Sequence, residues 1–196
     1  MGKPRAAALG TGAASTAALK GRHTSIHFAD SSSSTVIKQR NILLEKLMAQ
    51  SLASLNYHLV FSTKHRVRLI SEEFEQPLHR YVAGILRNHR GTLLRAGGMP
   101  DHRHWLVSLH RELAVAEAIR LIKSNSTPWI REKLGNRRFN WQGGYAAFSV
   151  SFSRCEAVAR YIDNQKIHHQ KRNFQEELRW LLETNGIAYD ERYLFA

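Results

Sequence analysis

Two histidines, His102 and His104, stand two residues apart at the head of an apolar run rich in strand-forming residues. Side chains on a β-strand alternate between two faces, so both imidazoles are expected on the same face. Two neighbouring imidazoles on a rigid strand provide half of a site for a divalent metal ion. The alternative is a chance pair, because exposed or hydrogen-bonded histidines are commoner than metal ligands.

A second pair, Tyr161 and Gln165, is separated by four residues and would share one face of a helix. Together with the histidines, this pair predicts a metal ion with three protein ligands beside a phenol nucleophile. A buried tyrosine with a satisfied hydroxyl is the ordinary alternative. His168 and His169 follow Gln165 closely enough for either to approach the metal, but contact with a DNA backbone or plain solvent exposure is the favoured interpretation.

The hydrophobic pattern predicts an α+β fold that would position these groups. Its order of elements is βαββαβ followed by further helices, the ferredoxin-like plan of an antiparallel sheet with helices on one face and additional C-terminal helices. The other sheet face is expected to be open to a ligand or a partner. A capping box from Ser153 to Glu156 is expected to begin the tyrosine helix, and Pro128 to weaken or kink the second helix. The aromatic tail is expected to dock. The expected strands are 55–63, 92–96, 101–109 and 146–152, and the expected helices are 71–88, 113–123, 153–170 and 174–183. Residues 129–134 could continue the second helix beyond the proline.

Composition limits the partners and the compartment. The 196 residues suffice for one well-buried domain and a tail, and the formal net charge of +13 indicates a polyanionic partner such as nucleic acid. The one cysteine, Cys155, rules out an internal disulfide, fits a reducing cytoplasm and is expected to be inert. No segment has the length and apolarity that a membrane span needs.

Residues 1–47 differ from the rest of the chain. They are basic, low in complexity and nearly free of aromatic residues, so they are expected to be disordered. The functional domain is therefore expected to occupy residues 48–196.

From about Met48 onward, the sequence resembles the single-tyrosine HUH transposases of the smallest bacterial insertion sequences, the IS200/IS605 type. The most specific part is the histidine pair with the downstream tyrosine and glutamine. The similar stretches, in the family's order, are 57–64, 99–104, 122–124, 141–145, 148–150 and Tyr161-Ile162 with Gln165.

The resemblance implies roles for these residues. His102, His104 and Gln165 would hold one Mg²⁺ or Mn²⁺, and Tyr161 would attack a phosphodiester in single-stranded DNA. The products would be a 5′-phosphotyrosine link and a free 3′-hydroxyl that later rejoins strands. The family acts as a homodimer on hairpins at the element's ends, which implies a bacterial cytoplasmic protein that joins the nucleoid when bound to DNA.

Arg103 departs from the family pattern, which has a bulky apolar residue between the two histidines. It would face the packed side of the strand, where an unpaired guanidinium is costly. A nearby acid, a wet strand edge or an impaired copy would each account for it. Impairment favours the rival interpretation of a domesticated, hairpin-binding protein that does not cut. A REP-associated tyrosine transposase is a further alternative.

Several basic and aromatic residues are candidates for DNA contact. Lys64, Arg66 and Arg68 follow the first strand, and Lys123 and Lys166 lie near the other expected loops and the tyrosine helix, so they could line a phosphate track. A solvated charged face is the alternative for each. Trp141 and Tyr145 could stack on unpaired bases, with burial in the core as an equal alternative.

Deletion of residues 1–47 is expected to leave DNA cleavage intact, because the expected domain begins at Met48. A cleavage assay that compares the full chain with residues 48–196 checks this, and an inactive shortened protein would contradict it.

Overall fold

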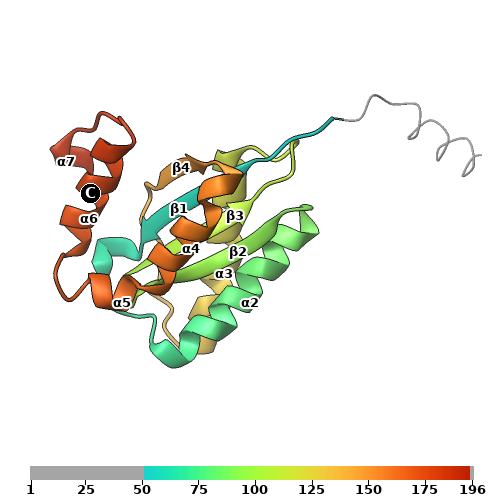
Figure 1. Ribbon diagram of the computed structural model, residues 1–196. Coiled ribbons are helices and arrows are strands. Elements are labelled where there is room, and N and C mark those ends of the chain that lie inside the picture. The colour runs from blue at the N-terminus through green and yellow to red at the C-terminus, as the bar shows by residue number, and fades with distance from the viewer. Residues whose placement is uncertain (1–50, 195–196) are drawn as a thin grey trace, which may run out of the picture. The chain divides into compact units, whose positions relative to one another are not determined.

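The computed structural model describes residues 51–194, and expectations for residues 1–47 lie outside that range. Figure 1 shows the strands of this part of the chain and the helices that surround them. The strands are β1 (Asn56–Ser62), β2 (Thr92–Met99), β3 (His102–Ser108) and β4 (Ala146–Val150). The α-helices are α2 (Glu72–Asn88), α3 (Val115–Leu134), α4 (Cys155–Asp163), α5 (Gln165–His168), α6 (Phe174–Thr184) and α7 (Glu191–Leu194), and two short 3₁₀ turns cover Lys64–Arg66 and Phe152–Arg154.

The strands form one antiparallel sheet in the order β2-β3-β1-β4. This order and the succession of helices confirm the predicted ferredoxin-like fold. β3 lies inside the sheet, between β2 and β1, so the histidine strand is held on both edges.

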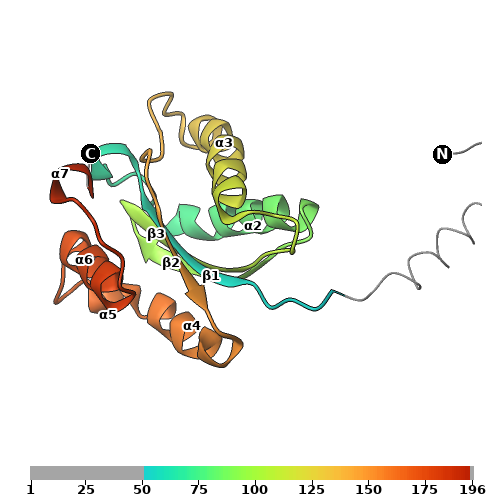
Figure 2. The ribbon, with the colours of Figure 1, turned by 90° about the horizontal axis from the view of Figure 1, so that it is seen from above.

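Helices cover both faces of the sheet, as Figure 2 shows. α2 and α3 pack on one face, over a core that includes Leu59, Phe61 and Trp105. α4 packs against β2 and β3 on the opposite face, which the sequence predicts to be open. That face also carries buried apolar residues from the inner strands, such as Val60 and Leu106, and these require a cover of apolar side chains.

α3 continues through Pro128 to Leu134, in agreement with the expected continuation over 129–134, although the sequence predicts a weakened or kinked helix at the proline. Tertiary packing outweighs the local cost of the proline. Ile130 is fully buried, and the Trp129 ring stacks on Tyr81 with centroids 4.5 Å apart. Side chains also satisfy carbonyls near the proline, including a hydrogen bond of 2.7 Å from the Thr127 hydroxyl to the Lys123 carbonyl.

The start of α4 differs from the predicted capping box. A 3₁₀ turn precedes the helix, and no side chain caps its N-terminus. Ser153 instead lies in a hydroxyl pair with Ser151, at 3.2 Å. A complete capping box occurs in α6, where Asn173 and Glu176 bond each other's backbone N–H groups.

A glycine lets α4 approach the sheet closely. A Cβ atom on Gly97 of β2 would lie 2.6 Å from the Ile162 carbonyl oxygen. Only a residue without a side chain allows this spacing, which brings Tyr161, the neighbour of Ile162, over the histidine strand.

The tail docks as expected. Tyr189 and Leu194 pack against the apolar cluster of α6, and Arg179 forms an ion pair of 2.7 Å with Glu191 of α7. No helix of residues 51–194 combines the length and apolarity needed to cross a membrane.

Arg103 is fully buried, and a nearby acid supplies its counter-charge. Its side chain faces α2, where Nη1 lies 3.1 Å from Glu75 Oε1. This outcome was one of the three open explanations for the departure from the family pattern. Lys166 also lies 4.0 Å from Glu75 Oε2, which links α5 to the same carboxylate.

Substitution Glu75→Gln is expected to lower the free energy of unfolding by about 2–3 kcal/mol, because it leaves the guanidinium buried without a counter-charge. Adding Arg103→Leu should restore most of that loss, since no charge then remains buried. Urea denaturation measures both. Glu73→Gln, at an exposed position of the same helix, is the matched control, and an equal effect of the two glutamate substitutions would contradict the assignment.

Candidate functional site

The site begins with the two histidines of β3. His102 and His104 are 1% and 0% exposed, and their ring centroids are 5.3 Å apart. Strand alternation puts both on the face covered by α4 to α6, opposite Arg103 and Trp105. The structure therefore brings the predicted pair together on one face.

Neighbouring groups orient both rings. His102 Nδ1 lies 2.9 Å from Asp101 Oδ1, which accepts its N–H and leaves Nε2 as the unprotonated nitrogen. His104 Nδ1 lies 2.9 Å from His58 Nε2. Burial lowers the pKa of His102 to about 4 and the pKa of His58 to about 3, so both rings are neutral at pH 7. A neutral ring fixed by a hydrogen bond at its far nitrogen is the form that ligates a metal.

Tyr161 and Gln165 reach the same place from two helices rather than one. The predicted continuous helix is interrupted at Asn164, between α4 and α5. Both side chains nevertheless donate to the same atom, Glu177 Oε1, from the Tyr161 hydroxyl and, at 2.7 Å, from Gln165 Nε2. The Tyr161 ring centroid lies 6.0 Å from that of His104.

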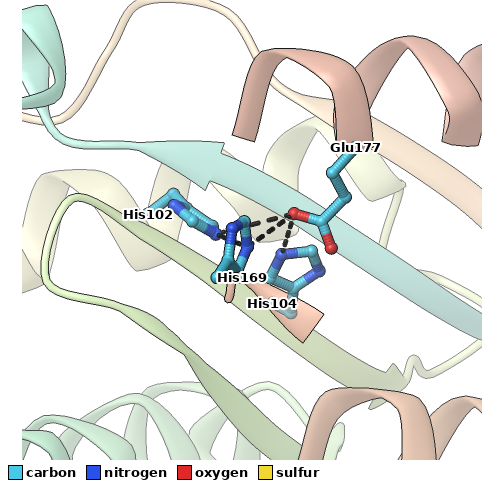
Figure 3. A group of neighbouring side chains, drawn as sticks. All are labelled: His102, His104, His169 and Glu177. Atoms are coloured by element: carbon cyan, nitrogen blue, oxygen red, sulfur yellow. Dashed lines mark hydrogen bonds and ion pairs between the residues drawn. The ribbon is translucent and has the colours of Figure 1, made fainter. Parts of the chain in front are cut away.

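Glu177 of α6 is the centre of this group, and it was not among the predicted residues. Its side chain is 0% exposed, and its Oε2 lies 3.0 Å from His169 Nε2 and 3.5 Å from His104 Nε2 (Figure 3). A sequence signal exists, because an acid three residues after Phe174 lies on the apolar face of an amphipathic helix. A charge on a buried face usually has a partner or a function.

His169 also belongs to this cluster, which corrects the expectation of backbone contact or solvent exposure. Its Nε2 lies 3.0 Å from His102 Nε2. The ligand atoms of His102, His104, His169 and Glu177 all lie within 4.8 Å of one another.

The donor set fits a divalent cation. His104 Nε2, Gln165 Oε1 and Glu177 Oε2 are buried and have no hydrogen-bond partner within residues 51–194. Imidazole nitrogens, a carboxylate and an amide oxygen are all metal ligands, and a cation would satisfy the unpartnered atoms together. These four histidine and glutamate side chains, with Gln165 beside them, are the residues that could hold a metal ion.

Electrostatics keep the phenol protonated. Burial raises the pKa of the Tyr161 phenol, and the Glu177 charge raises it further, well above the ordinary value. Burial alone would raise the pKa of the Glu177 carboxyl as well, but the close contacts of this carboxylate with the His104 and His169 rings outweigh burial and leave that pKa below its usual range. Glu177 is therefore an anion that accepts the phenol proton in a hydrogen bond.

Two candidate DNA contacts have structural roles here. The Lys123 ammonium donates to the carbonyls of Gln142 and Gly144, each at 2.7 Å, and burial lowers the pKa of Lys123 to about 8. Trp141 is 6% exposed and donates its indole N–H to Ser126 Oγ at 2.8 Å. The structure thus favours burial in the core over base stacking for Trp141. Lys123 stabilises the loop that precedes β4 through its hydrogen bonds to the loop carbonyls.

The other candidates are at the surface. Tyr145 is 47% exposed, and Lys64 and Arg68 are exposed as well. Arg66 is half-buried. Lys166 forms an ion pair with Glu72, and its Nζ lies 2.7 Å from Glu72 Oε1.

Comparison with known proteins places this site in context. Residues 51–165 match the family model described as "Transposase IS200 like". The ISDra2 transposase TnpA of Deinococcus radiodurans is 25% identical over 118 residues, which cover 57% of this chain and 84% of that protein. The transposase of insertion sequence element IS200 from Salmonella typhimurium is 26% identical over 131 residues, covering 62% of this chain and 83% of that one. A transposase crystal structure from Deinococcus radiodurans shares the fold, with a TM-score of 0.50 at 21% identity over 60% of this chain and 95% of that one.

Substitutions His169→Ala and Glu177→Gln are each expected to weaken Mn²⁺ binding at least about ten-fold, because even groups that only support metal ligands contribute that much. Isothermal titration of the full chain with MnCl₂ measures the affinity. His89→Ala, at an exposed histidine of the α2 C-terminus, is the control and should bind Mn²⁺ as the parent chain does. Equal affinity in all three variants would show that this cluster is not a cation site.

Proposed function

Since the chain belongs to the family of IS200-like transposases, whose members cleave DNA, we propose that it cuts and rejoins single-stranded DNA at the hairpin ends of an insertion sequence through Tyr161. The observation that carries the proposal is the meeting of the Tyr161 hydroxyl with the His102–His104 pair at the buried carboxylate of Glu177. A nucleophile and a set of metal donors then share one small volume.

Tyr161 attacks the phosphorus of a DNA phosphodiester. A bond forms between the phenol oxygen and phosphorus, the bond from phosphorus to the 3′ oxygen breaks, and that oxygen leaves as a 3′-hydroxyl after gaining a proton. Glu177 Oε1 holds the phenol proton before attack. The 5′-phosphotyrosine link conserves the bond energy, so the reverse reaction with another 3′-hydroxyl rejoins strands without ATP.

His102, His104 and Gln165 would hold the divalent cation, and His169 and Glu177 would add to the donor set. When bound, the cation would draw charge from the scissile phosphate and favour ionisation of the phenol. Without a positive partner, the Glu177 carboxylate would repel a phosphodiester. Three imidazoles suit Mn²⁺ better than Mg²⁺, which prefers oxygen ligands.

The placement of Arg103 supports a cutting enzyme over a non-cutting relative. Its guanidinium is on the opposite sheet face and is paired with Glu75, so it does not reach the cluster. We therefore retain the catalytic function.

We propose a homodimer as the acting form and hairpin-bearing single-stranded DNA as its partner, as the resemblance implies. Within the single chain, the Tyr161 ring already lies beside His104 of the same chain, which supports use of the tyrosine in cis.

The test is incubation of labelled single-stranded hairpin DNA with the protein and Mn²⁺, followed by a denaturing gel. A covalent adduct should form, disappear in Tyr161→Phe and persist in Tyr193→Phe, a control at an exposed tyrosine of α7. Tight binding without an adduct would instead favour the hairpin-binding alternative, and an adduct that survives Tyr161→Phe would remove Tyr161 as the nucleophile.

A further inference from the structure

A cavity of about 700 Å³ opens beside Tyr161, between α5 and α6. Its walls include Tyr161, Asn164, Lys171, Arg172 and Trp180. A volume of this size is within the range of small-molecule sites in proteins and accommodates a nucleotide. The cavity therefore lies next to the atom proposed to attack DNA, and neither the cation site nor the attack itself uses it.

Trp180 gives this cavity a flat aromatic wall. It is 40% exposed, whereas Phe174, Leu178 and Leu181 on the same helix are each 6% exposed. The core does not require an indole at this position, because the apolar face of α6 is already filled. The Trp180 ring centroid lies 6.1 Å from that of Tyr161, so a base stacked on the indole would be adjacent to the phenol.

The cavity also offers positive charge. The Arg172 guanidinium lies 5.5 Å from the centroid of the Trp180 ring, and Lys171 precedes it in the loop after α5. Neither side chain forms an ion pair with an acid in the described part of the chain. Cations without acidic partners beside an exposed indole match the phosphate and the base of one nucleotide.

A polar group is available to contact the edge of a base. Asn164 lies at the break between α4 and α5, is exposed, and lines the same cavity. A carboxamide offers both a donor and an acceptor, which is what recognition of a base edge needs.

We propose that this cavity is a subsite for one unpaired nucleotide adjacent to the scissile phosphate, with its base on Trp180 and its phosphate on Lys171 and Arg172. This inference rests on the proposed function, because it takes single-stranded DNA as the ligand. α6 lies beyond the residues that match the family model, so the subsite is a feature of the C-terminal part of this chain.

Equilibrium binding of single-stranded (dT)₁₂ to the full chain tests the subsite without any cleavage. Binding should quench tryptophan fluorescence, because Trp180 is the most exposed of the four tryptophans: Trp105 and Trp141 are buried, and Trp129 is half-buried and stacked on Tyr81. Trp180→Phe should abolish most of the quenching while affinity, read by anisotropy of labelled (dT)₁₂, changes less than about three-fold. Trp180→Leu, which removes the stacking surface, should weaken binding about ten-fold.

Two controls separate the subsite from general effects. Phe152→Leu removes another exposed aromatic side chain, and Arg87→Gln removes an exposed charge; both should bind (dT)₁₂ within about two-fold of the parent chain. Arg172→Gln should weaken binding by more than Arg87→Gln does. Circular dichroism verifies that each variant is folded.

The outcomes distinguish this inference from the proposed function. Quenching that persists in Trp180→Phe, or equal affinity of Trp180→Leu and Phe152→Leu, overturns the subsite even if the Tyr161 adduct forms. Quenching that depends on Trp180 supports the subsite even if no adduct is found. If Trp180→Leu is unfolded, the folded Trp180→Phe variant decides by its fluorescence alone.

Discussion

The buried carboxylate of Glu177 is the constraint on which the site depends. A carboxylate removed from water requires compensating donors or positive charge, and here one oxygen receives the Tyr161 hydroxyl and the Gln165 amide while the other faces His104 and His169. These contacts join α4, α5, α6 and the histidine strand. The side chain that holds the helices together is thus also the one that places the proposed nucleophile, Tyr161, beside the candidate metal donors.

Strand alternation separates two incompatible environments along β3. Arg103 and Trp105 face α2 and α3, where the arginine is neutralised by Glu75, while His102 and His104 face the C-terminal helices. A shift of one residue would exchange the two sets and bury the imidazoles in an apolar core. Pairing with β1 and β2 on both edges prevents such a shift. The sheet therefore maintains the candidate cation site by its register as much as by local packing.

The sequence predicts most of the sheet because strand signals are local, and the histidine pair follows from the same periodicity. The sequence-based prediction fails where contacts between residues far apart in the chain determine the local structure. Ser153 does not cap α4, because a 3₁₀ turn precedes the helix. Glu177 lies 73 residues beyond His104 in the chain, and its role depends on how α6 docks, which no local pattern encodes.

The docking of α6 also determines how DNA reaches the site. His102, His104, Gln165 and Glu177 are each at most 1% exposed, so the sheet, α5 and α6 close the cluster on most sides. Tyr161 is half-buried and borders the open cavity next to Trp180. A second cavity, of about 560 Å³, is also lined by Tyr161 and Trp180. In the proposed reaction, a phosphodiester would approach the cluster past Tyr161, beside Trp180 of α6 and the basic residues Lys171 and Arg172 of the loop that precedes α6.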